Sequence, residues 1–417
     1  MARRIIMAVT NDLLTDQRVD RSCRALQESG YAVTLIGRRL GHASGFGHTS
    51  NEVAEKALDA RPYRCVRMRL LFRRSALFYA EYNMRLLLKL LLMRADAFYA
   101  NDSDTLPACC WAARLRGKKL LFDAHELFPD VPELVGKPRV QRVWKWVERT
   151  CLPRVDAAFT VSQSVAEEYR RRYGVAITVV RNVQNRRGLP LCKSSRLPLC
   201  KPSQIENYPG AAALNVVGDS PAKVLLYQGA VNVGRGVREL VDVMGRLPQC
   251  RLVVAGDGDL LEELREYAAD KPWSERIMFL GRVDPNQLHA LTTKADLGVC
   301  LLEDLGLSYR CALPNRVGDF VQAGVPLLAT GFVEIQRVIE HYGIGATTEA
   351  CPAVKDGEAY DQYLGRLADT IADTLHAWHT MPQEERDRRF ARARKELCWD
   401  NEKKTLIKTI NAIFNEK

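Results

Sequence analysis

A glycine-rich junction follows one of the apolar runs in the second half of the chain. It runs Tyr227-Gln228-Gly229-Ala230-Val231-Asn232-Val233-Gly234-Arg235-Gly236. Gly234 and Gly236 flank Arg235 at the point where a strand should turn into a helix. Backbone amides at a helix N-terminus and a guanidinium together form a binding site for a diphosphate. The alternative is that the glycines only permit a turn and Arg235 is solvated, because a glycine-rich turn alone is a weak signal.

A second junction, Ala255-Gly256-Asp257-Gly258-Asp259, also follows an apolar run. It lacks the three spaced glycines of a dinucleotide fingerprint. A tight turn with an acidic residue as the cap of the next helix explains it at least as well as a ligand site does.

The third junction is Leu313-Pro314-Asn315-Arg316-Val317-Gly318-Asp319-Phe320, followed by Ala323-Gly324-Val325-Pro326. We expect a helix to open here with exposed amides beside Asn315 and Arg316, and with Asp319 about one turn inside. A carboxylate at that place is suited to bind two ribose hydroxyls. A purely structural helix start is the alternative.

The elements around these junctions alternate between short apolar runs and helical patterns, which predicts parallel sheets with helices on both faces. In the first half we expect strands at 5–9, 33–36, 97–100, 119–123, 157–161 and 177–180, and helices at 16–29, 139–151 and 164–173. In the second half we expect strands at 224–227, 252–255, 277–280, 297–301 and 326–329. Helices there should begin near Gly236, Asp259, Asp284 and Pro314, and the chain should be helical from Asp356 to its end. In doubly wound sheets, ligands bind beyond the carboxyl ends of the strands, where all three junctions lie.

The alternation of strands and helices stops between the two halves of the chain, which predicts two Rossmann-like domains. The fold class that we expect is therefore α/β. We place the first domain at 1–181, a linker or insertion at 182–222, the second domain at 223–390 and a helical tail at 391–417. Packing of the tail against the N-terminal domain is one option. The linker holds Leu-Pro-Leu-Cys-Lys twice, at 189–193 and 197–201. One repetition of a five-residue segment does not indicate a repeat architecture, and we assign this segment no chemistry.

The amino-acid composition limits the class of protein and the partners that we expect. The 417 residues are 47% hydrophobic and 27% charged, a profile typical of a globular protein and of neither a disordered nor a membrane-spanning one. The formal charge of +11 favours anionic partners without choosing among them. The twelve cysteines include no Cys-x-x-Cys pair and no set with zinc-ligand spacing, so we expect reduced, packed thiols and no metal site. The first apolar run, Ile5 to Val9, is shorter than the about 7–15 residues of an export signal, so we expect a cytoplasmic protein.

The segment 73–94 contains Leu86-Leu87-Leu88-Lys89-Leu90-Leu91-Leu92 with basic residues interspersed. A membrane-spanning helix needs about 20 mostly apolar residues, and the charges interrupt this run. One hypothesis is a basic amphipathic helix on an anionic membrane surface, and the other is a buried helix with exposed basic residues. We favour partial surface exposure.

The three junctions, in this order and spacing, resemble the donor half of the retaining glycosyltransferases of family four, which have a glycosyltransferase-B fold. Further segments are similar to a bacterial branch of that family: Val9-Thr10-Asn11-Asp12, Asp16-Gln17-Arg18-Val19, Gly37-Arg38, Phe122-Asp123-Ala124-His125-Glu126-Leu127-Phe128 and Val180-Arg181-Asn182-Val183. The resemblance covers nearly the whole chain. It implies an N-terminal acceptor domain and a C-terminal nucleotide-sugar donor domain with a cleft between them.

The resemblance also implies roles for individual residues. Arg235, between Gly234 and Gly236, would bind the donor diphosphate and stabilise the charge on the leaving group. The set Leu313, Pro314, Asn315 and Arg316 would lie against the phosphates and the sugar. Asp319 would hold the ribose, and Gly281, Arg282 and Val283 would border the base.

On the N-terminal side, His125 matches the position that faces the transferred sugar and the acceptor. A hydrogen-bonded structural histidine is the alternative. The candidates for contact with the acceptor are Asp16, Arg18 and Glu126. The alternative is that these residues are solvated loop charges. One departure concerns the family's pair of glutamates eight positions apart, for which this chain has Cys311 and Asp319. The contact of the first acid with the donor sugar is therefore unsupported.

The function that follows from the resemblance is transfer of a sugar, with retention of anomeric configuration, from a nucleotide-diphosphate donor to a glycan or lipid-linked acceptor. We expect no metal ion or other cofactor, no nucleic-acid partner, and a role in cell-surface polysaccharide synthesis. One alternative is an epimerase or phosphorylase of the same fold, although no cofactor lysine for a phosphorylase can be identified. Another is a non-catalytic basic binding protein, although its basic residues are spread out and no nucleic-acid motif is present.

Overall fold

The computed structural model describes residues 2–14, 16–39, 56–72, 75–185 and 222–415. The chain forms two compact units. Unit 1 comprises Met1–Arg181, Gly306–Ser308 and Asn401–Lys417, and unit 2 comprises Asn182–Leu305 and Tyr309–Asp400. Most of the expected linker, including both copies of Leu-Pro-Leu-Cys-Lys, lies outside the described residues. So do Arg73 and Arg74, the first two residues of the segment 73–94.

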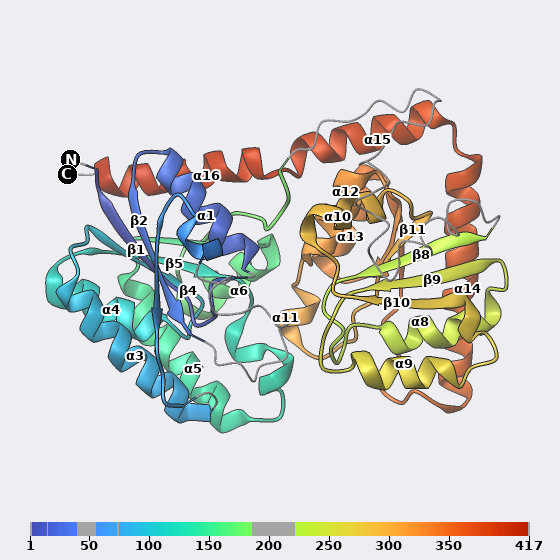
Figure 1. Ribbon diagram of the computed structural model, residues 1–417, viewed down its shortest axis with the longest axis horizontal. Helices are drawn as coiled ribbons and strands as arrows, with labels where there is room; N and C mark the ends of the chain where they lie inside the picture. Colours follow the sequence, from blue (N-terminus) through green and yellow to red (C-terminus); the bar gives the residue numbers. More distant parts are fainter. Residues whose placement is uncertain (1, 15, 40–55, 73–74, 186–221, 416–417) are drawn as a thin grey trace. The chain divides into compact units, whose positions relative to one another are not determined.

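Unit 1 is built on a parallel sheet of seven strands in the order β3-β2-β1-β4-β5-β6-β7 (Figure 1). The strands are β1 (Arg4–Ala8), β2 (Ala32–Arg38), β3 (Arg64–Met68), β4 (Ala97–Asn101), β5 (Lys119–Ala124), β6 (Ala157–Thr160) and β7 (Thr178–Val179). The order reverses at β1, which pairs with both β2 and β4. This reversal is the point at which doubly wound sheets open a crevice for ligands.

The helices of unit 1 lie on both faces of its sheet. They are α1 (Gln17–Glu28), α3 (Ser75–Leu92), α4 (Leu106–Arg116), α5 (Pro138–Cys151), α6 (Gln163–Tyr173) and α16 (Trp399–Asn415), with short 3-10 turns η1 (Phe128–Asp130), η2 (Pro132–Leu134) and η3 (Leu152–Arg154). Right-handed crossovers place α3, α4 and α5 on the face opposite α1, as Figure 1 shows. Among these three, α4 contacts both α3 and α5.

Unit 2 has a second parallel sheet, of six strands in the order β10-β9-β8-β11-β12-β13. The strands are β8 (Lys223–Gln228), β9 (Cys250–Ala255), β10 (Ile277–Gly281), β11 (Leu297–Cys300), β12 (Leu327–Thr330) and β13 (Gly345–Thr348). Alternate residues of β8 enter two different hydrophobic clusters: Leu225 and Tyr227 join one, and Val224 and Leu226 join the other. Both faces of this sheet are therefore covered, as in other buried parallel sheets.

The helices of unit 2 follow its strands in turn. They are α8 (Val237–Val243), α9 (Leu261–Ala269), α10 (Pro285–Thr292), α11 (Leu307–Arg310), α12 (Asn315–Ala323), α13 (Val333–Tyr342), α14 (Gly357–Thr380) and α15 (Gln383–Glu396), with 3-10 turns η5 (Met244–Arg246) and η6 (Ser274–Arg276). The unit assignment of α11 changes within the helix, at Tyr309. Among the described residues, no helix is long and apolar enough to span a membrane.

These two sheets confirm the predicted α/β architecture with its helical C-terminal segment. The expected strands are present, and α1 begins after Asp16 as its cap and buries Val19, Cys23 and Leu26 as predicted. The elements that were not anticipated include β3, β13, α11 and α13. The stretch expected to be helical from Asp356 onward is interrupted at 381–382 and at 397–398. Unit 2 extends to Asp400, so residues 391–400 of the expected tail belong to it.

Candidate functional site

Two loops run side by side at the carboxyl edge of the sheet in unit 2. The loop after β8 and the loop after β9 are joined by backbone hydrogen bonds. Gly229 N donates to Ala255 O at 3.0 Å, Val231 N donates to Asp257 O at 3.0 Å, and Leu260 N donates to Val231 O at 3.1 Å. The first two sequence junctions are therefore one structural feature.

The second junction is glycine-rich because the two backbones approach closely. A Cβ atom on Gly256 would lie 1.7 Å from Gly229 O, and one on Gly258 would lie 2.5 Å from Val231 O. The expectation of an acidic cap at Asp259 was wrong, because Leu260 is the N-cap of α9. Asp259 instead donates its backbone N–H to Asn232 Oδ1 at 3.1 Å, which adds a further link between the loops.

Arg235 lies between two glycines in the left-handed backbone region, Gly234 (φ +78°) and Gly236 (φ +72°), directly before α8. Its guanidinium carbon is 4.9 Å from the ring centroid of Tyr309. Its Nε atom is buried and has no hydrogen-bond partner among the described residues. Since buried polar groups are normally paired, this nitrogen is available for a ligand.

Arg316, in the first turn of α12, lies close to the first loop. Its side chain is only 6% exposed, and its guanidinium carbon is 4.4 Å from the ring centroid of Tyr227. One of its nitrogens is 3.1 Å from the place where Gly229 would carry a Cβ, so glycine leaves room for it. Another nitrogen, Nη1, is buried without a hydrogen-bond partner in the described chain. The first and third junctions thus meet at this arginine.

Asp319 is positioned by two residues that sequence analysis missed. Gln228 Nε2 donates to Asp319 Oδ2 at 3.0 Å, and Thr292 Oγ1 donates to Gln228 Oε1 at 2.8 Å. Gln228 and Thr292 are each 1% exposed. The signal that could have found Gln228 is a polar side chain at the end of an otherwise apolar strand, immediately before a glycine.

The remaining predicted donor residues follow two other strands of the same sheet, β10 and β11. Pro314 is the N-cap of α12, Asn315 is exposed at its first position, and Leu313 is half-buried. Gly281 ends β10 with φ +65° and is followed by exposed Arg282 and half-buried Val283. The segments that carry these residues come after β8, β9, β10 and β11, and the strand order reverses at β8. A doubly wound sheet binds ligands at such a reversal.

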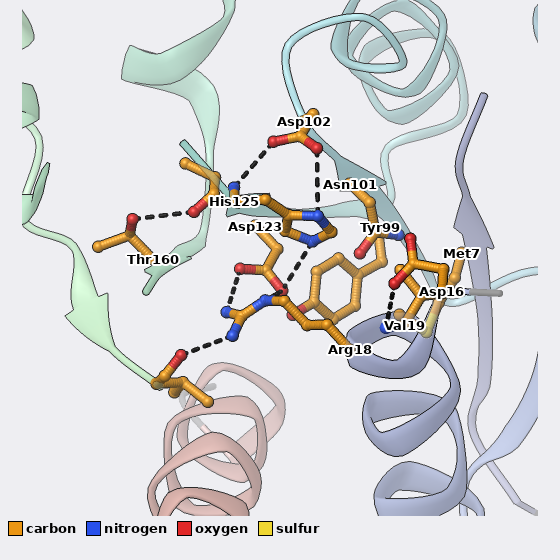
Figure 2. Close-up of polar contacts among 12 residues, drawn as sticks. Met7, Asp16, Arg18, Val19, Tyr99, Asn101, Asp102, Asp123, His125 and Thr160 are labelled. Carbon is orange, nitrogen blue, oxygen red and sulfur yellow. Dashed lines mark hydrogen bonds and ion pairs between the residues drawn. The ribbon is translucent and has the colours of Figure 1, made fainter. Parts of the chain in front are cut away.

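A second polar cluster lies in unit 1, between the carboxyl end of β5 and the first turn of α1 (Figure 2). Arg18 donates to both carboxylate oxygens of Asp123, from Nη2 at 2.6 Å and from Nε at 3.0 Å, and its Nη1 donates to Val180 O at 2.7 Å. The two side chains are 3% and 1% exposed. Burial opposes the charge of Asp123, but the ion pair with Arg18 and the nearby His125 hold the pKa of Asp123 well below its usual range.

His125 lies between two carboxylates. Its Nδ1 is 3.2 Å from Asp102 Oδ2, its Nε2 is 3.6 Å from Asp123 Oδ2, and its backbone N–H donates to Asp102 Oδ1 at 2.8 Å. Burial disfavours the imidazolium, but Asp102 and Asp123 outweigh it and raise the pKa of His125 to about 9. Burial also raises the pKa of Asp102, to about 8, so the two groups titrate as a pair.

The side chain of His125 is partly exposed, at 19%. Its Nε2 atom is itself buried, lies 3.6 Å from Asp123 Oδ2 and has no hydrogen-bond partner among the described residues. A histidine that is protonated near neutral pH can donate a hydrogen bond or a proton from that atom. Asp102 has φ +62°, a backbone conformation that is uncommon for residues other than glycine. Such conformations cluster at functional sites.

The acceptor-side candidates do not all lie where the sequence suggested. The interpretation of Arg18 as a solvated loop charge was wrong, because it lies in the first turn of α1 and is buried against Asp123. Asp16 is the N-cap of that helix: it accepts from Val19 N at 3.0 Å and from Asn11 Nδ2 at 2.8 Å. Glu126 is exposed. Among the described residues, no group of three or more His, Cys, Asp or Glu could hold a metal ion.

Comparisons with solved structures identify the architecture. Sucrose-phosphate synthase from Thermosynechococcus elongatus matches with a TM-score of 0.71 and 16% identity over 100% of both chains. HepE from Anabaena, in complex with UDP-glucose, matches with a TM-score of 0.68 and 13% identity over 98% of this chain and 99% of that one. The lipopolysaccharide outer core galactosyltransferase WaaB matches with a TM-score of 0.62 and 14% identity over 98% and 99%. At these identities the likeness establishes the glycosyltransferase-B fold.

Two family models match the chain and show the family to which it belongs. Residues 16–183 match the model for Glycosyltransferase Family 4, and residues 222–369 match the model for Glycosyl transferases group 1. The first match covers the Arg18–Asp123–His125 cluster, and the second covers Arg235, Arg316 and Asp319. No curated protein sequence matches the chain. The chain therefore belongs to the glycosyltransferases of the glycosyltransferase-B fold, with a Family 4 domain followed by a group 1 domain.

Proposed function

We propose that this enzyme transfers a sugar from a nucleotide-diphosphate donor to a glycan or lipid-linked acceptor with retention of anomeric configuration. Two relatives by fold support the substrate class: HepE is described in complex with UDP-glucose, and WaaB is a galactosyltransferase of the lipopolysaccharide outer core. We also propose a role in the synthesis of cell-surface polysaccharide, because WaaB is described as acting on the outer core of lipopolysaccharide. The described cysteines are free, which agrees with the cytoplasm as the place of action.

The observation that carries the proposal is a pair of arginines with unsatisfied nitrogens at the carboxyl edge of the sheet in unit 2. Arg235 Nε and Arg316 Nη1 are both buried and lack hydrogen-bond partners in the described chain. A diphosphate supplies the acceptor oxygens that these donors require. Two fixed positive charges at this place would stabilise the charge that develops on the leaving nucleoside diphosphate. We therefore propose that the reaction needs no metal ion or other cofactor.

The neighbouring residues fit the rest of a nucleotide. Asp319, which accepts a hydrogen bond from Gln228, would accept hydrogen bonds from the ribose hydroxyls. The segment from Gly281 to Val283 follows the strand next to β9 and would border the base. In unit 1, we propose that His125 acts at the reacting sugar or the acceptor, with Asp102 and Asp123 keeping it protonated. Glu126 is our candidate for acceptor contact.

The first test is a thermal-shift panel with UDP, GDP, ADP and their sugars. One nucleotide family should raise the midpoint of unfolding by mass action, and Arg235→Ala should lose that response. Arg238→Ala is a matched control, because Arg238 has the same guanidinium-to-ring distance, 4.9 Å, on the ring of Tyr267. That control should respond like the wild type. A well-folded wild-type chain that responds to no nucleotide would count against the donor site.

Product analysis then separates the reactions that this fold supports. We expect a glycoside of retained configuration, detected by NMR, only when both donor and acceptor are present, and we expect the rate to persist after treatment with EDTA. Conversion of the nucleotide sugar without an acceptor would indicate an epimerase instead. Inversion at the anomeric carbon would contradict the proposed stereochemistry.

A further inference from the structure

Three neighbouring helices of unit 1 expose large apolar side chains on the face that points away from the sheet. The exposed residues are Leu77, Met84, Leu88 and Leu92 on α3, Trp111 and Leu115 on α4, and Val140, Val143 and Trp146 on α5. We call this set the three-helix surface. Because α4 contacts both α3 and α5, the helices form one layer on the sheet. Their outward faces are therefore adjacent (Figure 1).

On α3 the exposed residues form a stripe of their own. Leu77, Met84, Leu88 and Leu92 are spaced by helical intervals and are 56%, 60%, 57% and 87% exposed. A different stripe, which includes Phe78, Tyr82 and Leu86, packs into the core. The helix is thus apolar on two sides, although unit 1 buries only one of them. Contiguous exposed apolar patches mark sites of interaction with proteins or membranes.

Two tryptophans extend this pattern to the other helices. Trp111 is 50% exposed and Trp146 is 65% exposed. Beside Trp146, a surface hollow is lined by Arg139, Arg142 and Val143. Tryptophan is enriched at the boundary between lipid and water, because its ring is apolar and its N–H remains hydrogen-bonded.

The exposed charged residues of these helices are all basic. The basic residues of α3, α4 and α5 are Arg85, Lys89, Arg114, Arg116, Arg139, Arg142, Lys145 and Arg149. Their two acidic residues, Glu81 and Glu148, are 7% and 1% exposed. Glu81 accepts hydrogen bonds from the backbone of Leu71 and Phe72, and Glu148 accepts from Ser103 and two tyrosines. Arg116 donates to the backbone of α3 and its following turn, and Arg85 and Lys145 pair with Glu81 and Asp130. The exposed charged residues of the three helices are nevertheless all basic, namely Arg85, Arg114, Arg139, Arg142 and Arg149, so the outward face of the layer is basic and apolar.

This combination favours one occupant. A nucleic acid would match the basic charge, but leucine, methionine and valine contribute little to contacts with phosphates. A second copy of the chain bound through the same surface would place basic residues against basic residues. An anionic bilayer takes up both features, because its headgroups attract the basic side chains and its acyl boundary buries the apolar ones. We propose that the three-helix surface binds an anionic lipid bilayer, with the three helices lying in the plane of its interface.

The test is flotation of the full-length protein with vesicles of phosphatidylcholine, with and without about one third phosphatidylglycerol. The protein should float with the anionic vesicles, bind neutral ones at least about tenfold more weakly, and detach as salt rises. Emission from the exposed tryptophans should shift to shorter wavelength on binding. A protein that stays in the soluble fraction with anionic vesicles at low salt would overturn the proposal.

Matched variants locate the contact. Arg142→Glu should lower binding about tenfold, while Lys408→Glu, the same change at an exposed position of α16, should leave it unchanged. Leu88→Gln should also weaken binding, while Val354→Gln, at a residue 65% exposed in unit 2, should not. Equal losses in a variant and its control would contradict the assignment to this surface. Self-association that Trp146→Ser abolishes, or duplex DNA binding that Arg142→Glu abolishes without any vesicle binding, would assign the surface to another partner.

Discussion

Arg18 and Asp123 depend on each other for their charges. Both are almost completely buried, and the guanidinium engages both carboxylate oxygens and Val180 O, which leaves little of either charge unsatisfied. Because a buried charge is costly when its partner is removed, this pair fixes the first turn of α1 to the end of β5. It also keeps Asp123 ionised beside His125. We therefore regard Arg18 as a positioning residue for His125.

The variant Asp123→Asn should destabilise the chain strongly. Arg18 would remain buried without a carboxylate, at a cost of about 3–5 kcal/mol. Urea unfolding followed by circular dichroism measures this. The control is Asp361→Asn, which breaks the exposed pair of Asp361 with Arg246 and should cost less than about 1 kcal/mol. Similar, small effects of both variants would contradict the role of the buried pair.

The stability that His125 contributes should fall as pH rises. Its pKa is about 9 in the folded chain, against about 6.5 for an ordinary histidine. A group whose folded pKa is raised stabilises the fold fully below its unfolded pKa and ceases to do so above its folded pKa. The difference in thermal midpoint between the wild type and His125→Gln should therefore be constant below about pH 6 and shrink between about pH 6.5 and 9.

Two further measurements check this pH dependence. NMR titration of the His125 ring should give a midpoint above the ordinary value, and Asp102→Asn should lower it. A midpoint at or below the ordinary value, or a difference in stability that does not change with pH, would show that the two carboxylates do not hold the proton.

The strands and helices that could be predicted from the sequence are those whose burial dictates an apolar pattern. Central strands of parallel sheets are covered on both faces, so they appear as continuous apolar runs such as the one that became β8. The missed strands, β3 and β13, are edge strands. Their sequences, Arg-Cys-Val-Arg-Met and Gly-Ala-Thr-Thr, carry charged, polar or small residues because an edge is only partly covered. Such strands lack the apolar run on which the prediction depends.

The candidate site was predictable in its glycines and charges but not in its contacts. The segments of the donor site could be located because each follows a strand. The Arg18–Asp123 pair joins positions 105 residues apart, and Gln228 lies 91 residues from Asp319. Such partners follow from the register of the sheets, which a single sequence does not specify. The close approach of Gly256 to Gly229 likewise requires the neighbouring loop to be known.

The variant Gly256→Ala should disrupt the donor loops as a unit. Its Cβ would lie 1.7 Å from Gly229 O, a contact that only movement of the backbone can relieve. We expect a loss of about 2 kcal/mol or more in stability and a loss of the nucleotide-induced thermal shift. Gly365→Ala is the control: it lies within α14 with no atom within 4 Å of the new Cβ, and it should stabilise the chain by about 0.5–1 kcal/mol. An unchanged nucleotide response in Gly256→Ala would mean that the loop contact is not needed for binding.

At the scale of the whole molecule, the end of the chain belongs to the unit in which the chain begins. The chain leaves unit 1 after Arg181, and its last residues, Asn401–Lys417, are part of unit 1 again. Glu402 accepts from Arg181 N at 2.9 Å, and Tyr31 OH donates to Asn411 Oδ1 at 2.5 Å. The ring of Phe414 packs against that of Tyr31, with 5.8 Å between the centroids and an angle of 35° between the planes. Unit 1 is therefore built from segments that are far apart in the sequence.

The packing of α16 within unit 1 leads to a prediction that distinguishes the two units. Leu406, on α16, is completely buried, so Leu406→Ala should cost about 2–5 kcal/mol. Because that loss falls on unit 1, the shift caused by a nucleotide should persist, since the proposed donor residues lie in unit 2. Leu367→Ala, an equally buried position in α14, should instead weaken the unit that binds the nucleotide. If Leu406→Ala costs less than about 1 kcal/mol, or removes the nucleotide response while Leu367→Ala retains it, then the C-terminal helix does not stabilise unit 1 in the way its contacts indicate.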